Sequence, residues 1–96
     1  MDDVREKLRA EVLACRWADL EPHHTRGGLL LVRPDLDLLE AGVALATDRT
    51  DRVEIWLTVG RLGRPNGPAV ADLTARDPRF QVVIVQPWVL AQEIVT

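Results

Sequence analysis

Cysteine is almost absent from this sequence: Cys15 is the only one in 96 residues, so an internal disulfide bond is impossible. A fold without covalent cross-links is typical of a reducing compartment, and we expect a cytoplasmic protein. No apolar run approaches the roughly 20 residues of a membrane-spanning helix. The charged N-terminus also lacks the apolar centre of a signal peptide. The sequence therefore predicts neither a membrane protein nor a secreted one.

Aromatic residues are scarce as well. Tyrosine is absent, Phe80 is the sole phenylalanine, and the remaining aromatic residues are Trp17, Trp56 and Trp88. Tryptophan anchors cores and interfaces alike. Trp56 falls on a helical apolar stripe, which favours the core. Trp88 follows Pro87 at a break in an apolar segment, so it suits a core residue and an exposed anchor equally.

Motifs that carry chemistry are missing too. The sequence has no Gly-x-Ser-x-Gly elbow and no glycine-rich phosphate loop. Cys15, Asp19 and His23 are spaced by four, as metal ligands on one helix face would be, but Pro22 is expected to interrupt that helix. The sequence thus predicts no catalytic set, no metal site and no cofactor, and it favours a protein that is not an enzyme.

The formal net charge is −3 and is unevenly distributed. Residues 1–48 hold ten acidic and six basic side chains, whereas residues 49–96 hold five acidic and six basic ones. Neither half has the concentrated positive charge of a dedicated nucleic-acid binder. Arg61 and Arg64 nevertheless follow a predicted helix, as arginines do on the ribbon of a winged helix. Nucleic acid therefore stays open as an alternative partner.

The first apolar segment predicts a helix over residues 2–20. Its apolar residues recur at helical spacing and widen into a broad face: Val4, Leu8, Val12, Leu13, Cys15, Trp17 and Leu20. Pro22 is expected to end this helix. Gly27 and Gly28 then turn the chain into a short buried strand near residues 29–33.

Three further helices are expected. One begins after Asp35 or Asp37 and is apolar on nearly every side, so it should lie at the centre of the fold. Gly42 within it indicates close packing by a neighbour. The next begins near Thr50 or Asp51, and its buried face is expected to carry Val53, Trp56, Leu57 and Gly60. A brief fourth helix begins at Pro68, because proline is favoured at the first helical position.

The end of the chain predicts extended structure. Residues 80–86 form a strand that is apolar on both faces. For residues 88–95, alternation and β-branching favour a strand, whereas Ala91-Gln92-Glu93 would suit a helix, and we favour the strand. The whole chain, 1–96, is therefore expected to form one α+β domain, with about four helices packed on a small sheet that includes strands near 29–33 and 80–86.

Residues 80–96 are too apolar for a free tail and must be buried in a core or an interface. The interface candidates are Trp88, Val89, Leu90 and Gln92. A chain of this size buries a limited share of its surface, and self-association is a common way to gain stability. The leading prediction is an interaction domain that binds a second copy of itself or another protein.

A third hypothesis concerns a small ligand or an enzymatic step. Arg33 could pair with an anion, and Asp35 or Asp37 could move a proton, because a pair of acids is the minimum for general acid and base catalysis. The competing interpretation is structural, since acids at a helix start satisfy free backbone N–H groups.

Several stretches resemble one family across nearly the whole chain. These are Leu8…Trp17-Ala-Asp-Leu20, Pro34-Asp-Leu-Asp-Leu-Leu39, Val53-Glu-Ile-Trp56…Gly60-Arg-Leu62 and Pro87-Trp-Val-Leu-Ala-Gln-Glu93. Together they are similar to a family of small bacterial proteins classed as a domain of unknown function. Gly42 and Ala91 stand where larger aliphatic residues are expected. The resemblance implies a stand-alone bacterial cytoplasmic protein and implies no substrate.

Overall fold

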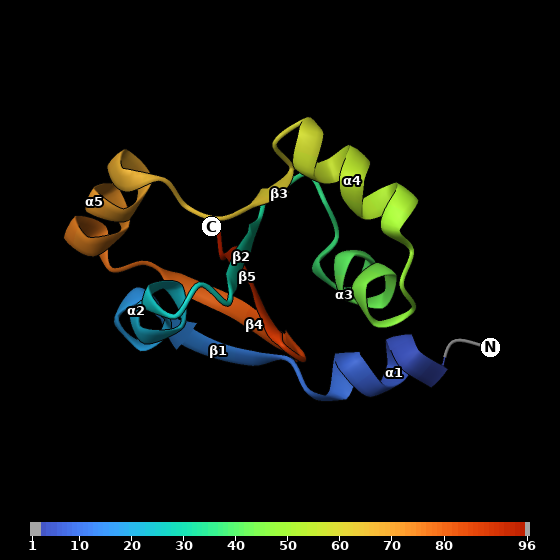
Figure 1. Ribbon diagram of the computed structural model, residues 1–96. Helices are drawn as coiled ribbons and strands as arrows, with labels where there is room; N and C mark the ends of the chain where they lie inside the picture. The colour runs from blue at the N-terminus through green and yellow to red at the C-terminus, as the bar shows by residue number, and fades with distance from the viewer. Residues whose placement is uncertain (1–2, 96) are drawn as a thin grey trace.

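A five-stranded mixed sheet runs through the middle of the molecule, with helices on both of its faces (Figure 1). The computed structural model describes residues 3–95. Its strands follow the order β1-β4-β5-β2-β3. Their bounds are β1 Leu13–Arg16, β2 Leu29–Val32, β3 Leu62–Gly63, β4 Arg79–Val85 and β5 Trp88–Glu93. The helices are α1 Asp3–Ala10, α2 Trp17–Thr25, α3 Leu38–Ala46, α4 Thr50–Thr58 and α5 Gly67–Arg76.

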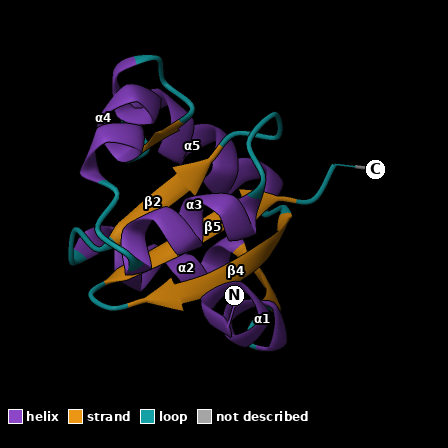
Figure 2. Ribbon diagram, turned by 90° about the vertical axis from the view of Figure 1, so that its right-hand side faces the viewer, coloured by secondary structure: helices purple, strands orange, loops and turns teal. Residues whose placement is uncertain are grey.

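The sheet is mixed because β2 and β5 pair in parallel, whereas the other three pairs are antiparallel. β4 and β5 form a hairpin joined by Gln86 and Pro87, with Val85 opposite Trp88. Figure 2 shows β2, β5 and β4 side by side behind α3. The α+β class is confirmed, although five helices replace the expected four.

Each face of the sheet carries its own apolar core. On the first face, α1, α3 and α4 cover Leu30, Val83 and Leu90. On the second face, α2 and α5 cover a core that includes Phe80 and Ala91. Successive residues of a strand point to opposite faces, so a strand that serves both cores has to be apolar at nearly every position. This explains the apolar character of the last part of the chain.

The predicted first helix is wrong. The chain leaves α1 after Ala10 and forms β1 before it enters α2. The reason lies in the two cores: Leu8 packs on the first face, whereas Trp17 and Leu20 pack on the second. Their spacing fits one helix, but a single helix cannot reach both faces of a sheet.

The predicted effect of Pro22 is wrong as well. Pro22 lies inside α2, which continues to Thr25. Proline lacks the N–H that would bond to the carbonyl of Ala18, and this short helix accepts the loss of one hydrogen bond. The helix begins at Trp17, with the Asp19 carboxylate accepting a hydrogen bond from the Arg16 N–H at 3.1 Å.

The later elements confirm the sequence patterns. Asp37 is the N-cap of α3, because its carboxylate accepts a hydrogen bond from the Leu39 N–H at 3.1 Å. Asn66 caps α5 in the same way, through the Ala69 N–H at 2.9 Å. The fourth predicted helix is longer than expected, since α5 spans ten residues. The segment after Pro87 forms β5, which confirms the choice of extended chain.

Gly42 of α3 lies against the sheet, as the sequence indicates. A Cβ atom at this position would lie 3.1 Å from Leu8 Cδ1, 3.6 Å from Val83 Cγ1 and 3.7 Å from Leu90 Cδ1. A side chain larger than a methyl group has no room there, so the helix and the sheet approach closely only because residue 42 is glycine.

We therefore predict that Gly42→Val lowers the free energy of unfolding by about 1–3 kcal/mol through overpacking. Urea unfolding monitored by tryptophan fluorescence measures this change. Ala46→Val is the matched control, because Ala46 lies on the exposed side of the same helix. It should cost about 0.5 kcal/mol from helix propensity alone. Equal losses in the two variants would contradict the packing explanation.

Candidate functional site

The predicted interface segment lies mostly inside the protein. Leu90 is fully buried in the first core, and Val89 is buried in the second. Both side chains are therefore used by the chain's own core, which leaves them no surface for a partner. The apolar pattern that suggested an interface comes from burial on two faces.

Gln92 has a structural role in the same strand. Its Nε2 donates hydrogen bonds to the carbonyl oxygens of Arg33 at 2.8 Å and Leu36 at 2.6 Å. These bonds attach β5 to the loop that leads from β2 into α3. The amide donor of Gln92 is thus occupied within the chain.

Trp88 is half-buried at the start of β5, where it packs against the first core. The guanidinium carbon of Arg64 lies 5.6 Å from the centre of its ring, which is cation–π geometry. The structure therefore brings together one residue from the predicted interface and one from the predicted nucleic-acid site. Trp88 keeps part of its surface and stays a candidate for contact with a partner.

Three further candidates, Arg61, Asp35 and Arg33, also lie close together. Arg61 Nε lies 3.3 Å from Asp35 Oδ2, and the Arg33 N–H donates to the Arg61 carbonyl oxygen at 2.9 Å. Asp35 thus balances the charge of Arg61, which weakens the case for a phosphate backbone at this position. Both sequence hypotheses for these residues stay predictions.

Asp37 is separated from this group. Its Oδ2 accepts a hydrogen bond from Arg5 Nη2 at 2.7 Å, which ties α1 to the start of α3. This hydrogen bond from Arg5 is the largest cause of a lowered pKa of Asp37; burial opposes it, and the hydrogen bond from the Leu39 N–H lowers the pKa further. Such an ionised cap stabilises the helix and does not accept a proton near neutral pH.

The three candidate metal ligands do not form one site, although Cys15 and Asp19 line the same depression. Cys15 lies in β1, whereas Asp19 and His23 lie on α2. Within residues 3–95, groups of three or more histidine, cysteine and acidic side chains that could hold a metal ion do not occur. Burial raises the pKa of the Cys15 thiol, and the negative charge of Asp19 adds to the effect. A thiol of raised pKa is a poor nucleophile and a poor metal ligand.

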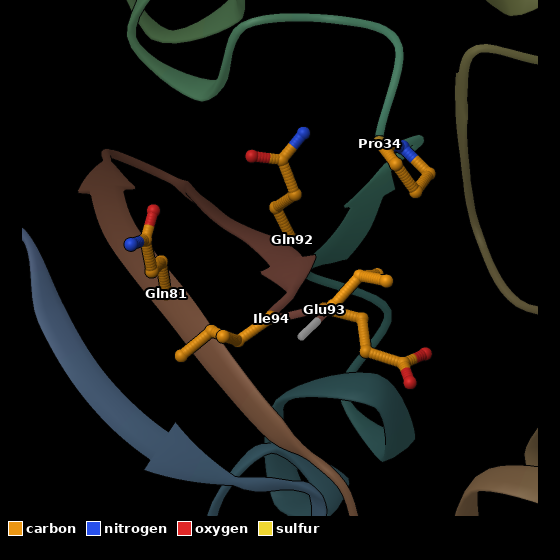
Figure 3. Close-up of a pocket in the computed structure, with 6 residues that line it drawn as sticks. Pro34, Gln81, Gln92, Glu93 and Ile94 are labelled. Carbon is orange, nitrogen blue, oxygen red and sulfur yellow. The ribbon is translucent and has the colours of Figure 1, made fainter.

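A shallow depression of about 250 Å³ lies on the open part of the first face, near the end of β5 (Figure 3). Gln81 and Gln92 are cross-strand partners there, and their side chains project from the same side of the sheet in Figure 3. Pro34 and Ile94 complete the wall. Glu93 is the only acid of this depression, and it is paired with Arg76 at 2.8 Å. The depression offers the amide of Gln81 and the amide oxygen of Gln92 for hydrogen bonding, and the described residues of its lining include no basic side chain.

The largest exposed apolar side chains on a helix belong to α4 and its end. Ile55 and Val59 are 60% and 61% exposed and lie one helical turn apart. We call these two residues the α4 patch. Leu57 is also exposed, but it lies on the other side of the helix, with the buried Trp56 between the two sides. The prediction that Leu57 shares the buried face is wrong.

The sequence contains a pattern that indicates the α4 patch, next to the stripe that was predicted to be buried. Trp56 is the buried residue of the predicted stripe and Val53 is half-buried, and Ile55 and Val59 fall outside that stripe at spacing i, i+4. An aliphatic pair off the buried stripe is an exposed pair.

The fold defines a small α+β domain with a mixed sheet between two helical layers. Residues 3–93 match the family described as Protein of unknown function (DUF2288), and the chain belongs to that family. The expected resemblance to a family of unknown function is confirmed. None of the helices described in the structure is long and apolar enough to cross a membrane.

The same fold occurs in a solved structure, the NMR solution structure of PA1075 from Pseudomonas aeruginosa. The two sequences are 38% identical, the alignment covers 100% of this chain and 89% of the other, and the TM-score is 0.84. A search of curated proteins gave no match.

The role of Asp37 leads to a prediction. Asp37→Ala should destabilise the protein by about 1 kcal/mol at neutral pH, because it removes the cap of α3. The folded-state pKa is lowered, so this stabilisation is present above the ordinary pKa of aspartate and is lost as pH falls through the lowered value. The difference in Tm between wild type and variant should therefore shrink below about pH 4.

Thermal unfolding across a pH series measures this difference. Asp35→Ala is the control, because Asp35 is exposed and its loose pair with Arg61 should contribute little. A difference in Tm for Asp37→Ala that stays constant down to the acid limit of folding would contradict the proposed role of the ionised carboxylate.

Proposed function

We propose that this protein is a non-enzymatic interaction domain that associates with a second copy of itself through the α4 patch. The observation that supports the proposal is the exposure of Ile55 and Val59, each about 60%, one turn apart on the outer helix. Aliphatic side chains one turn apart on a helix form part of a ridge that packs into the groove of a second helix.

The edges of the sheet are poor sites for a partner. At one edge, the backbone N–H of Arg16 in β1 is already bonded to Asp19. At the other edge, β3 has two residues and is followed by Arg64 and Pro65, which are residues that protect an edge strand. Strand addition is thus disfavoured, and side chains on helices are left to make the contact.

A second copy fits the α4 patch because a helix can pack against its own copy about a two-fold axis, which brings Ile55 and Val59 of the two copies together. The charges around the patch have both signs, since Asp51 and Glu54 alternate with Arg49 and Arg52 at the start of α4, and Arg61 and Arg64 follow its end. In such an antiparallel pair, Glu54 of each helix lies beside the C-terminal end of the other helix. The helix dipoles then also oppose each other favourably.

A specific dimer buries about 800 Å² per partner, and the α4 patch would form the centre of such an area.

Ile55→Glu tests the proposal. We expect the wild-type protein to dimerise with increasing concentration and the variant to stay monomeric, because the two introduced carboxylates would lie near the two-fold axis. Light scattering after size exclusion gives the mass of each species. Leu57→Glu is the matched control on the opposite side of α4 and should dimerise as wild type does.

Circular dichroism would show that both variants are folded, since each replaced side chain is exposed. A wild-type protein that is monomeric throughout the concentration series would refute the proposal. Loss of the dimer in Leu57→Glu and not in Ile55→Glu would place the contact elsewhere.

A further inference from the structure

A pocket of about 310 Å³ lies on the second face of the sheet, between the end of α2 and the turn of the β4–β5 hairpin. Ile84 and Val89 line it from the sheet, where they are cross-strand partners. His23 in the last turn of α2 and Arg26 at its C-cap line it from the helix. Because α4 packs on the first face, this pocket is separate from the α4 patch.

The loop after α2 is fixed against the hairpin. The Val89 N–H donates a hydrogen bond to the Gly28 carbonyl oxygen at 2.8 Å. A Cβ atom at residue 28 would lie 3.4 Å from the Pro87 carbonyl oxygen, so the loop and the turn are in close contact. The two sides of the pocket are therefore held together before any ligand enters, and a pocket formed in advance loses less conformational entropy on binding.

The pocket carries a positive charge that no acid balances. Arg26 is its arginine, and the described residues of its lining include no aspartate or glutamate. Within residues 3–95, Arg26 makes no ion pair with a carboxylate. Its Nη2 donates a hydrogen bond to Nδ1 of His23 at 2.8 Å. An imidazole nitrogen that accepts is uncharged, so the guanidinium group keeps its full charge and most of its N–H donors.

The same hydrogen bond decides which ring nitrogen of His23 carries the proton. A guanidinium group only donates, so Nδ1 has to accept and the proton of the ring is on Nε2. Within the part of the chain that the structure describes, this Nε2–H has no acceptor. His23 therefore offers a ligand one N–H donor beside those of Arg26.

The carbonyl end of α2 is closed next to these donors. The carbonyl oxygens of Pro22, His23 and His24 each accept a hydrogen bond from a backbone N–H of the following loop, at 2.9–3.1 Å. Free carbonyl groups at a helix end would repel an anion. Because the loop occupies these three, the guanidinium group of Arg26 is the main charge that a ligand meets.

We infer that this pocket binds the carboxylate of a small molecule that has an apolar body. The two oxygens of a carboxylate match the parallel donors of a guanidinium group. Arg26 balances the single charge of a carboxylate, whereas a phosphate group carries up to about two negative charges. Ile84, which is 45% exposed, gives the apolar body a surface together with Pro87 and Val89. The volume of about 310 Å³ is at the lower end of the roughly 300–1,000 Å³ of ligand pockets, so the ligand is small.

Titration of the isotope-labelled protein with benzoate, followed by amide NMR spectra at constant pH and ionic strength, tests the inference. We expect saturable shifts confined to residues 23–28 and 84–89. Benzamide has nearly the same shape without the charge and should bind at least about tenfold more weakly. Acetate should shift the same amides with weaker affinity than benzoate, because it lacks the apolar body.

Arg26→Gln should bind benzoate at least about tenfold more weakly than wild type, because it removes the charge that pairs with the carboxylate. Arg79→Gln is the matched control, since it removes the same charge at the other end of β4, outside the pocket. The control should bind as wild type does. Both arginines are exposed, so the amide spectra of the two variants should keep the dispersion of a folded protein.

Shifts that do not saturate, or an equal loss in the two variants, would refute the inference, because they indicate general charge attraction. Equal affinity for benzamide would refute the role of the carboxylate. Tighter binding of inorganic phosphate, lost in Arg26→Gln, would also refute the inference in favour of a phosphate site. The Ile55→Glu variant should bind benzoate as wild type does, so failure of the dimer and failure of this site are distinguishable.

Discussion

Burial of the β4–β5 hairpin on both faces is the constraint on which the rest of the structure depends. Leu90 and Ala91 are neighbours in β5, and each is 0% exposed, one in each core. Every face needs its own helical layer, so the chain has to place α1, α3 and α4 on one side and α2 and α5 on the other. The parallel pairing of β2 with β5 requires a long connection between them, and α3, α4, β3, α5 and β4 form it.

The same constraint decides which elements the sequence could predict. Continuous apolar runs predicted β2 and β4 correctly, and local capping chemistry placed the starts of α3 and α5. The prediction of a single first helix was wrong because helical spacing indicates only which residues would share one face of a helix. Leu8 and Trp17 satisfy that spacing but belong to different cores, and only the position of the sheet separates them. Long-range packing thus overrides a local pattern that is otherwise sound.

The candidate sites follow the same logic. The sequence identified Arg61, Asp35, Arg64 and Trp88 as polar or aromatic residues of interest, but it assigned them to three separate hypotheses. The structure pairs Arg61 with Asp35 and places Arg64 over Trp88. Such pairings depend on which loops lie close together in the folded protein, and the spacing of residues along the chain does not predict them. An apolar terminal segment, in turn, does not distinguish an interface from a strand buried on two faces.

With both sheet faces covered, the outer helices provide most of the surface left for function, and α4 carries the α4 patch. Arg52 lies beside Glu40 of α3, and Ile55 lies about one turn further along the same helix. The Trp56 ring contacts Arg52 and is buried in the first core, so the position of Arg52 depends on how α4 packs on α3. A partner on the α4 patch would therefore act on the helix that carries both Arg52 and Trp56, and a shift of α4 would change the packing of the first core.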